Sequence, residues 1–181
     1  FSSGAAAGDY DGDGDTDLYV CNLNGSVLFR NNGDGTFTDV TGKAGVGNAD
    51  RAAVAAAWFD YDEDGRLDLY VVNYIEFVAS YNLFYAPDGF PGPLAYAAEL
   101  DHLYRNRGDG TFEDVTQQTG IAAAGRAMSV TAADFDDDGF DDIYVSNDAM
   151  ENFLYHNEGG RRFRRCDDRG RGYRSHARVD A

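Results

Sequence analysis

Basic residues are scarce in this chain: its 181 residues include 15 lysines and arginines against 32 acidic residues, a formal net charge of −17. So negative a protein repels phosphate groups, which excludes nucleic acid and anionic membrane surfaces as partners. No stretch reaches the roughly 18 apolar residues of a membrane-spanning helix, so we expect no membrane span. The motifs G-x-S-x-G, H-E-x-x-H and C-x-x-C and a phosphate-binding loop are also missing, and we expect a protein that is not an enzyme.

Cysteine and proline are rare as well. The two cysteines, Cys21 and Cys166, are too few to define a redox compartment. Cys21 falls within an apolar run, and we expect it to be a small buried side chain of a strand. The three prolines are confined to one segment, at Pro87, Pro91 and Pro93. That segment is expected to interrupt an otherwise regular repeat.

Aspartate is abundant, and three copies of the spacing D-x-D-x-D-G-x-x-D stand at residues 9–17, 60–68 and 134–142. The side chains at positions one, three and five can point inward together, the glycine at six permits a sharp turn, and the carbonyl of position seven offers a further oxygen. Ca²⁺ takes 6–8 oxygen ligands at about 2.3–2.6 Å, so these loops predict about three structural calcium ions. The expected ligands are, in chain order, Asp9, Asp11, Asp13, Asp15, Asp17, Asp60, Asp62, Asp64, Arg66, Asp68, Asp134, Asp136, Asp138, Phe140 and Asp142.

One such loop by itself is commonly a solvated Asp/Gly turn, but three copies in register favour a metal. An EF-hand would need a glutamate at position twelve and a helix on either side. Position twelve is instead Val20, Val71 or Val145. Each loop runs into β-branched and aromatic residues, which are typical of a strand. The aspartate at position nine is expected to close this shorter loop.

A second signature follows each loop: L-[FY]-[RH]-N, a glycine-rich turn and a phenylalanine, at residues 28–37, 103–112 and 154–163. Apolar residues on both sides of such a turn predict a β-hairpin. The distance from Asp60 to Asn106 is 46 residues, whereas the corresponding distance in the first copy is 22. An insertion near residues 75–98, which holds all three prolines, accounts for the excess.

Small residues precede each aspartate loop, most clearly the alanines at 52–57. Alanine is the best helix former, but these segments lack helical apolar spacing, and we expect inner strands crowded around an axis. The predicted fold class is therefore all-β: a β-propeller of four-stranded blades with calcium loops, with about three blades present as a partial propeller or open arc. The expected divisions are repeats at about 1–47, 48–122 (insertion 75–98) and 123–163, then a basic irregular tail at 164–181.

The combination of D-x-D-x-D-G-x-x-D-[LI]-Y-V with L-[FY]-R-N-x-G-D-G-T-F resembles the FG-GAP/VCBS repeats of integrin-α-type propellers. Further stretches at 72–74, 89–92, 101–106 and 146–155 are similar to the ASPIC/UnbV and cartilage-acidic-protein group. The resemblance covers about residues 4–163. It implies a secreted, calcium-binding, seven-bladed propeller with metal loops between the first and second strands of a blade. It also implies an adhesion or binding role without established catalysis.

The leading hypothesis is a calcium-binding, secreted module with a non-enzymatic adhesion or protein-interaction role. Extracellular calcium modules bind at about 10⁻⁴–10⁻³ M, so the expected location is extracellular, periplasmic or on the cell surface. The expected partner is an unidentified extracellular protein or polysaccharide, and exposed blade edges would allow self-association. The alternative is a carbohydrate-binding propeller, or the non-catalytic part of a polysaccharide-degrading enzyme, using aromatic residues of the insertion. A calcium-assisted lyase or hydrolase is a further hypothesis, for which no general base can be named.

Other conspicuous residues have simpler interpretations. The tripeptide Arg107-Gly108-Asp109 occupies a predicted hairpin turn, which favours a structural role. His156 takes the position of Arg30 and Arg105 in the other copies, so we expect a surface or hairpin residue rather than a metal ligand. Two interpretations of the tail at 164–181 remain open. It is either a reading-frame artefact or truncation scar, or a disordered basic extension that folds back on the acidic loops.

Overall fold

The computed structural model describes residues 2–77 and 92–166, so the centre of the insertion and the chain beyond Cys166 lie outside the described residues. Within them, twelve strands form three four-stranded antiparallel sheets, each built from consecutive strands apart from the short β7 (Glu99–Leu100) in the insertion. Each four-stranded sheet is called a blade here. Blade one contains β1 (Ser2–Gly8), β2 (Asp17–Asn22), β3 (Val27–Asn31) and β4 (Phe37–Asp39). Blade two contains β5 (Ala53–Phe59), β6 (Asp68–Asn73), β8 (His102–Asn106) and β9 (Phe112–Asp114). Blade three contains β11 (Ala127–Ala133), β12 (Asp142–Asn147), β13 (Phe153–Asn157) and β14 (Phe163–Cys166).

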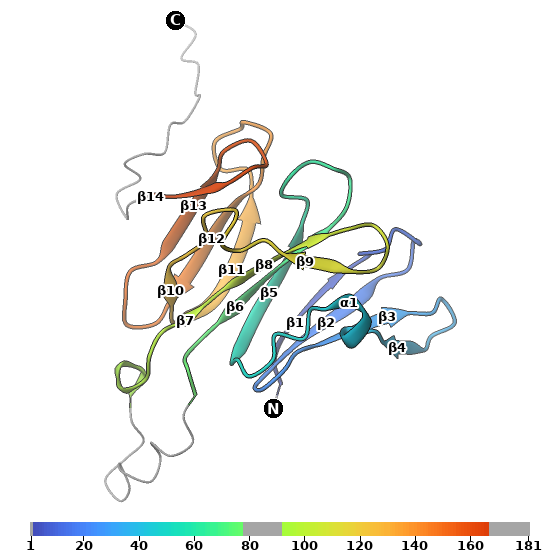
Figure 1. Ribbon diagram of the computed structural model, residues 1–181, viewed down its shortest axis with the longest axis horizontal. Helices are drawn as coiled ribbons and strands as arrows, with labels where there is room; N and C mark the ends of the chain where they lie inside the picture. Colours follow the sequence, from blue (N-terminus) through green and yellow to red (C-terminus); the bar gives the residue numbers. More distant parts are fainter. Residues whose placement is uncertain (1, 78–91, 167–181) are drawn as a thin grey trace, which may run out of the picture.

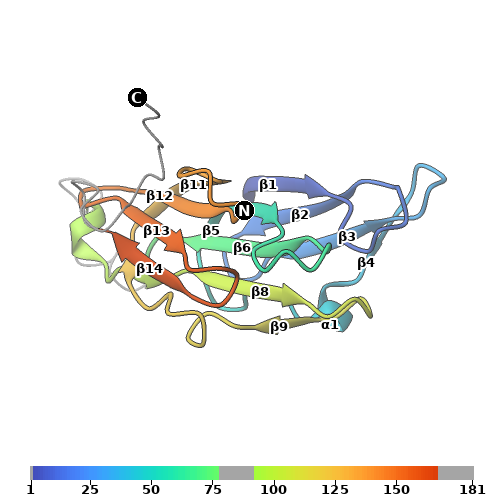
Figure 2. The ribbon, with the colours of Figure 1, turned by 90° about the horizontal axis from the view of Figure 1, so that it is seen from above.

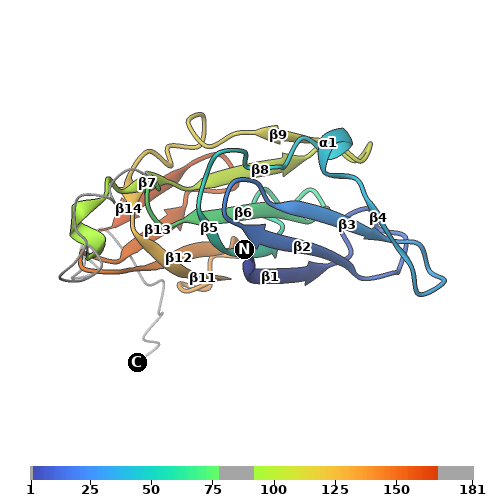
Figure 3. The ribbon, with the colours of Figure 1, turned by 90° about the horizontal axis from the view of Figure 1, so that it is seen from below.

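The predicted all-β fold class is confirmed: the blades stand side by side as an arc, with the first strand of each blade along one margin (Figures 1, 2 and 3). The strand β14 continues to Cys166, beyond the repeat boundary that we set at residue 163. It does so because Arg164 and Arg165 pair with β13 in an ordinary antiparallel register.

The alanine-rich segment of blade two is strand β5, as we predicted against its helix propensity. Tertiary packing explains this outcome, because β5 lies between β1 and β11 and contacts both. The Ser3 hydroxyl donates a hydrogen bond to the Ala53 carbonyl at 2.5 Å. A side chain at Gly4 would collide with the Val54 carbonyl. Small residues therefore allow the inner strands to approach one another closely, and larger ones would push the blades apart.

Two hydrophobic clusters fill the spaces between neighbouring blades. Between blades one and two, the Trp58 ring lies 6.0 Å from Tyr10 and 6.0 Å from Phe112, measured between ring centroids. Between blades two and three, Tyr61 lies 6.0 Å from Phe163. Cys21 is fully buried in the first cluster, which confirms its predicted structural role. Each blade thus completes its core only against a neighbour.

The two outer faces of the arc lack such a neighbour within the described residues. Phe37 in blade one is 49% exposed, although the corresponding phenylalanines of the other blades are buried. Phe135 in blade three is 45% exposed, although Tyr10 and Tyr61 at the same position are buried. The exposed aromatic residues at the two ends are therefore the counterparts of residues that pack against each other at the inner boundaries.

Four short elements depart from the regular pattern. The helix α1 (Thr41–Ala44) ends at Gly45, whose φ of 79° favours glycine. In the insertion, the 3-10 helix η2 (Pro93–Ala95) precedes β7 (Glu99–Leu100), which pairs with β10 (Ala124–Gly125). The Arg126 guanidinium donates to the carbonyls of Pro93 at 3.0 Å and Tyr96 at 2.8 Å. The end of the insertion is thereby attached to blade three.

A buried carboxylate, Asp101, joins the insertion to the centre of blade two. It is fully buried, and it accepts hydrogen bonds from the Tyr70 hydroxyl at 3.1 Å and the Asn73 backbone N–H at 2.9 Å. Burial raises the pKa of Asp101 to about 7. A carboxyl whose pKa is higher in the folded than in the unfolded protein makes the fold less stable as pH rises from about 4 to about 7.

We predict that Asp101→Asn removes this part of the pH dependence. The amide keeps the size of the side chain and cannot ionise, so the variant should be more stable than the parent at pH 8 and closer to it at pH 5. Urea unfolding at fixed calcium concentration between pH 5 and pH 8 measures the effect. Exchange of the exposed Asp50 to Asn is the control. Parallel pH profiles for the parent and Asp101→Asn would contradict the prediction.

Candidate metal sites

The three aspartate loops lie at the same end of the three blades, where each loop joins the first strand to the second (Figure 1). The first aspartate of the loop shapes it by accepting backbone hydrogen bonds. Asp9 accepts from the N–H groups of Gly12 at 2.9 Å, Asp13 at 3.1 Å and Gly14 at 2.9 Å. Gly14 has a φ of 94°, a conformation that requires glycine. Asp60 and Asp134 accept equivalent bonds in the other loops.

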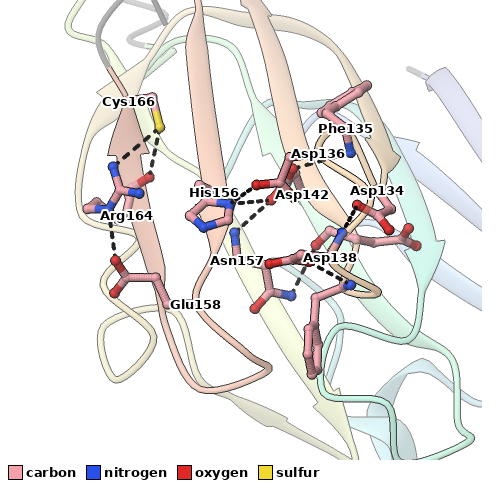
Figure 4. Close-up of polar contacts among 12 residues, drawn as sticks. Asp134, Phe135, Asp136, Asp138, Asp142, His156, Asn157, Glu158, Arg164 and Cys166 are labelled. Atoms are coloured by element: carbon pink, nitrogen blue, oxygen red, sulfur yellow. Dashed lines mark hydrogen bonds and ion pairs between the residues drawn. The ribbon is translucent and has the colours of Figure 1, made fainter. Parts of the chain in front are cut away.

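The aspartate at position nine connects each loop to the third strand of its blade. In blade three, Asp142 accepts from the Phe135 N–H at 3.3 Å on one oxygen and from the Asn157 N–H at 2.7 Å on the other (Figure 4). Asp17 and Asp68 make the same two contacts, and all three side chains are fully buried. The position-nine aspartate therefore closes the loop, as expected, but it does so by hydrogen bonding to two separate backbone segments.

Burial raises the pKa of Asp17, and that of Asp68 to about 7. The aspartates at position three are shifted in the same direction, first by burial and then by a neighbouring carboxylate. This holds for Asp11 beside Asp13 and for Asp62 beside Asp64. A carboxylate that is withdrawn from water and placed beside another needs positive charge to remain ionised. A divalent cation at the loop would provide that charge.

Two of the three position-three aspartates, Asp62 and Asp136, leave a buried oxygen atom without a hydrogen-bond partner. Asp62 contacts the Arg105 guanidinium through Oδ2 at 2.7 Å, but its Oδ1 is buried and accepts no hydrogen bond. Asp136 has a similar environment in the third loop. Its Oδ2 lies 3.6 Å from Nδ1 of His156, and its buried Oδ1 has no hydrogen-bond partner. Buried oxygens of this kind are costly unless something binds them. Their chemistry fits a hard cation.

The structure brings many of the predicted ligands together, with one oxygen of each within 4.8 Å of the others. Three groups consist of aspartates alone: Asp9 with Asp11 and Asp13, Asp60 with Asp62 and Asp68, and Asp134 with Asp136 and Asp138. A fourth group joins Asp136 and Asp142 to His156. Two other predicted ligand side chains are engaged elsewhere: Asp64 is bonded to the Arg66 guanidinium, and Asp15 lies against Gly33 of the hairpin turn. Asp17 makes the same two backbone hydrogen bonds as Asp68 but lies outside the first group. The residues present therefore fit Ca²⁺ at each loop.

Sequence reasoning missed the nitrogen-bearing side chain that faces two of the loops. Arg105 pairs with Asp62 at 2.7 Å and Asp64 at 3.4 Å, and His156 lies at the same position in blade three. We had expected His156 to be a surface or hairpin residue, but its side chain is only 14% exposed and faces Asp136 and Asp142. The available signal was the alternation of a strand, which places this residue and the loop on the same side.

Sequence reasoning also missed a contact between blades. The Asn106 side-chain amide donates to the Tyr10 carbonyl of the preceding blade at 2.7 Å and to the Leu67 carbonyl of its own blade at 3.0 Å. Asn157 repeats the arrangement toward Tyr61 at 2.8 Å. Asn31, in the first blade, donates to Thr16 of its own loop at 3.1 Å. Each inner blade boundary thus carries a hydrogen bond to the backbone of an aspartate loop.

Comparison with known proteins agrees with this architecture. The FG-GAP-like repeat family matches residues 9–71 and 94–145. The chain belongs to the FG-GAP-like repeat family. It is 26% identical to cartilage acidic protein 1 of Xenopus tropicalis over 133 residues, which cover 73% of this chain and 17% of that protein. It is 25% identical to cartilage acidic protein 1 of Mus musculus over 171 residues, covering 73% of this chain and 26% of that protein.

These matches confirm the resemblance to the cartilage acidic protein group. The chain spans about a quarter or less of the length of these curated relatives. A solved structure that describes recognition of non-reducing terminal N-acetylglucosamine by an Agrocybe aegerita lectin aligns with a TM-score of 0.29 at 17% identity. That alignment covers 88% of this chain and 50% of the other. Among the described residues, no helix combines the length and the apolar character needed to cross a membrane.

We predict that Asn106→Ala destabilises the protein more than Asn31→Ala does. Both substitutions remove a bond within a blade, but only the first removes the bond between blades and leaves a buried carbonyl without its partner. The expected losses in the free energy of unfolding are roughly 1–3 kcal/mol for Asn106→Ala and below about 1 kcal/mol for Asn31→Ala. Urea unfolding measures both, and equal losses would show that the contact between blades contributes nothing.

Proposed function

We propose that this FG-GAP-like chain is a calcium-stabilised extracellular interaction module without catalytic activity. One observation carries the proposal: each of the three loops gathers oxygens of three aspartates within 4.8 Å of one another. In two loops, a buried oxygen in that group has no hydrogen-bond partner. The residues in these loops are carboxylates on a turn, which is the ligand set that Ca²⁺ prefers.

Bound calcium would act on the fold through residues that the loop already holds. Its charge would offset the mutual repulsion of the position-three and position-five aspartates and would favour the ionised form of the buried position-nine aspartate. The loop also presents the Tyr10 or Tyr61 carbonyl to the next blade. Ordering the loop therefore supports the boundary between blades as well as the blade itself.

The proposed location outside the cell follows from affinity and from the relatives. Extracellular calcium modules bind at about 10⁻⁴–10⁻³ M, which matches extracellular calcium and not the resting cytosol. The similarity to cartilage acidic protein 1 supports an extracellular protein-interaction role. The partner is proposed to be an extracellular protein, with a polysaccharide as the alternative. The aromatic residues expected to serve a polysaccharide belong to the insertion, most of which lies outside the described residues.

Two faces that complement each other, one on blade three and one on blade one, support association through the blade faces. On the outer face of blade three, Phe135 occupies the position that Tyr10 and Tyr61 have at the inner boundaries. On the outer face of blade one, Phe37 occupies the position of their partners, Phe112 and Phe163. A second copy can therefore place its first blade on the third blade of another, by the same packing that joins the inner blades. Such a contact is head-to-tail and does not use the same surface twice.

We predict that calcium raises the melting temperature of the protein and that Asp62→Asn reduces the increase. In millimolar calcium, about one to ten times the proposed dissociation constant, each occupied site adds about 0.4–1.4 kcal/mol to stability. The substitution removes a charged ligand from one calcium loop, so the share of the increase that this loop contributes should be lost. Without calcium the variant should lose little, because relief of the repulsion between Asp62 and Asp64 offsets loss of the ion pair with the exposed Arg105. Thermal melts in chelator and in millimolar calcium measure both effects.

The control for Asp62→Asn is Glu113→Gln, which removes one negative charge at an exposed strand position outside the loops. It should keep the full response to calcium. A melting temperature that is the same in chelator and in calcium would overturn the proposed role of the metal.

For self-association, we predict that both Phe135→Ser and Phe37→Ser shift the protein toward the monomer. Each substitution replaces an exposed aromatic residue on one of the two complementary faces, so neither removes a core contact. Sedimentation velocity over a concentration series measures the shift, with Met128→Ser as the control because Met128 is also exposed. A parent protein that stays monomeric throughout the series would contradict the prediction.

A further inference from the structure

We propose that the third aspartate loop binds a transition-metal divalent cation of the Zn²⁺, Mn²⁺ or Co²⁺ class, with His156 as a nitrogen ligand beside Asp136 and Asp142. This inference rests on the proposed function in assigning a metal to the loop, and it gives that loop a different ligand chemistry. The other two loops have only oxygen ligands. The chain would therefore bind two kinds of metal ion.

The three side chains already have the spacing of ligands around one ion. The imidazole Nδ1 of His156 lies 3.1 Å from Asp142 Oδ1 and 3.6 Å from Asp136 Oδ2 (Figure 4). Metal–nitrogen and metal–oxygen bonds of about 2.0–2.2 Å place neighbouring ligand atoms roughly 3–3.5 Å apart. The ligand atoms of the three residues all lie within 4.8 Å of one another. A metal can enter this group with small side-chain movements.

The backbone holds these ligands in place. Ile143 pairs with Tyr155, so the preceding Asp142 on β12 stands opposite His156 on β13. The Asn157 N–H donates to Asp142 at 2.7 Å and fixes the orientation of that carboxylate. Hydrogen bonds of this kind to a ligating carboxylate orient it and strengthen metal binding.

A buried oxygen without a partner points to a missing ligand at this group. The Asp136 side chain is only 3% exposed, and its Oδ1 accepts no hydrogen bond. Asp136 also belongs to the cluster with Asp134 and Asp138, so it joins the nitrogen side of the group to the carboxylates of the loop. A cation bound there would satisfy this oxygen.

The other blades show why the third loop is different. In blade two, the Arg105 guanidinium contacts the equivalent carboxylate, Asp62, at 2.7 Å, and Arg30 has the same position in blade one. A guanidinium has donors and no acceptor, so it cannot bind a metal. An imidazole offers a nitrogen lone pair, a ligand that suits Zn²⁺ and its neighbours better than Ca²⁺. The change from arginine to histidine is therefore a change of ligand set.

The test compares the full chain with His156→Arg, which installs the residue of the other two loops. Calorimetric titration with Zn²⁺ in millimolar calcium should show one site in the parent that is lost or weakened at least about tenfold in the variant. Pulsed electron paramagnetic resonance of bound Mn²⁺ should detect imidazole nitrogen coupling in the parent and not in His156→Arg. The converse variant, Arg105→His, should gain a Zn²⁺ site in blade two.

The outcomes separate this inference from the proposed function. If parent and His156→Arg bind Zn²⁺ with the same number of sites and affinities, or if the parent shows no nitrogen coupling, the inference is overturned even when calcium still raises the melting temperature. If calcium has no effect on the melt but His156→Arg loses the Zn²⁺ site, the structural role of calcium fails and the nitrogen-ligated site stands. The nitrogen coupling is measured on the parent protein alone. It therefore shows whether a histidine nitrogen binds the metal even if a variant does not fold.

Discussion

The fold depends on one buried carboxylate in each blade, the aspartate at position nine of the loop. One of its oxygens holds the second residue of the loop, and the other holds the third strand, as Asp68 does with Tyr61 and Asn106. Without it, the loop would lose its connection to the hairpin, and the backbone groups it satisfies would be left buried without partners. Burial raises the pKa of Asp17, and that of Asp68 to about 7, so the ionised forms of these two carboxyls need nearby positive charge. The proposed metal would meet this need.

The same loops connect the blades to one another. The loop presents the Tyr10 or Tyr61 carbonyl at the boundary, and the next blade supplies an asparagine amide that binds it. The ring of the same residue packs into the space between the blades, so polar and apolar contacts meet at one position. A metal that orders the loop would consequently stabilise the arc as a whole. Repeat proteins commonly gain stability in this way, through interfaces between neighbouring units.

The strands and loops were predictable because their signals are local and repeated. Strand residues follow directly after each D-x-D-x-D-G-x-x-D loop, and three copies in register identified β2, β6 and β12 together. The segment at β5 was harder, since its alanines favour a helix in isolation. Its strand conformation follows from crowding between two neighbouring strands. The role of Asn106 could not be predicted, because its partner lies in another blade. The role of His156 was missed, although strand alternation places it on the same side as the loop.

By itself, the sequence determined the all-β repeat, the positions of the aspartate loops and the side chains that can bind a cation, because each of these depends on spacing within about a dozen residues. Only the tertiary structure decided which carboxylates converge and which are engaged elsewhere, as Asp64 is by Arg66. It also decided that a histidine enters the third loop, and that Phe37 and Phe135 are exposed within the described residues. The physical reason is that convergence, burial and charge pairing depend on how strands and blades pack, and packing brings together residues that are far apart in the chain.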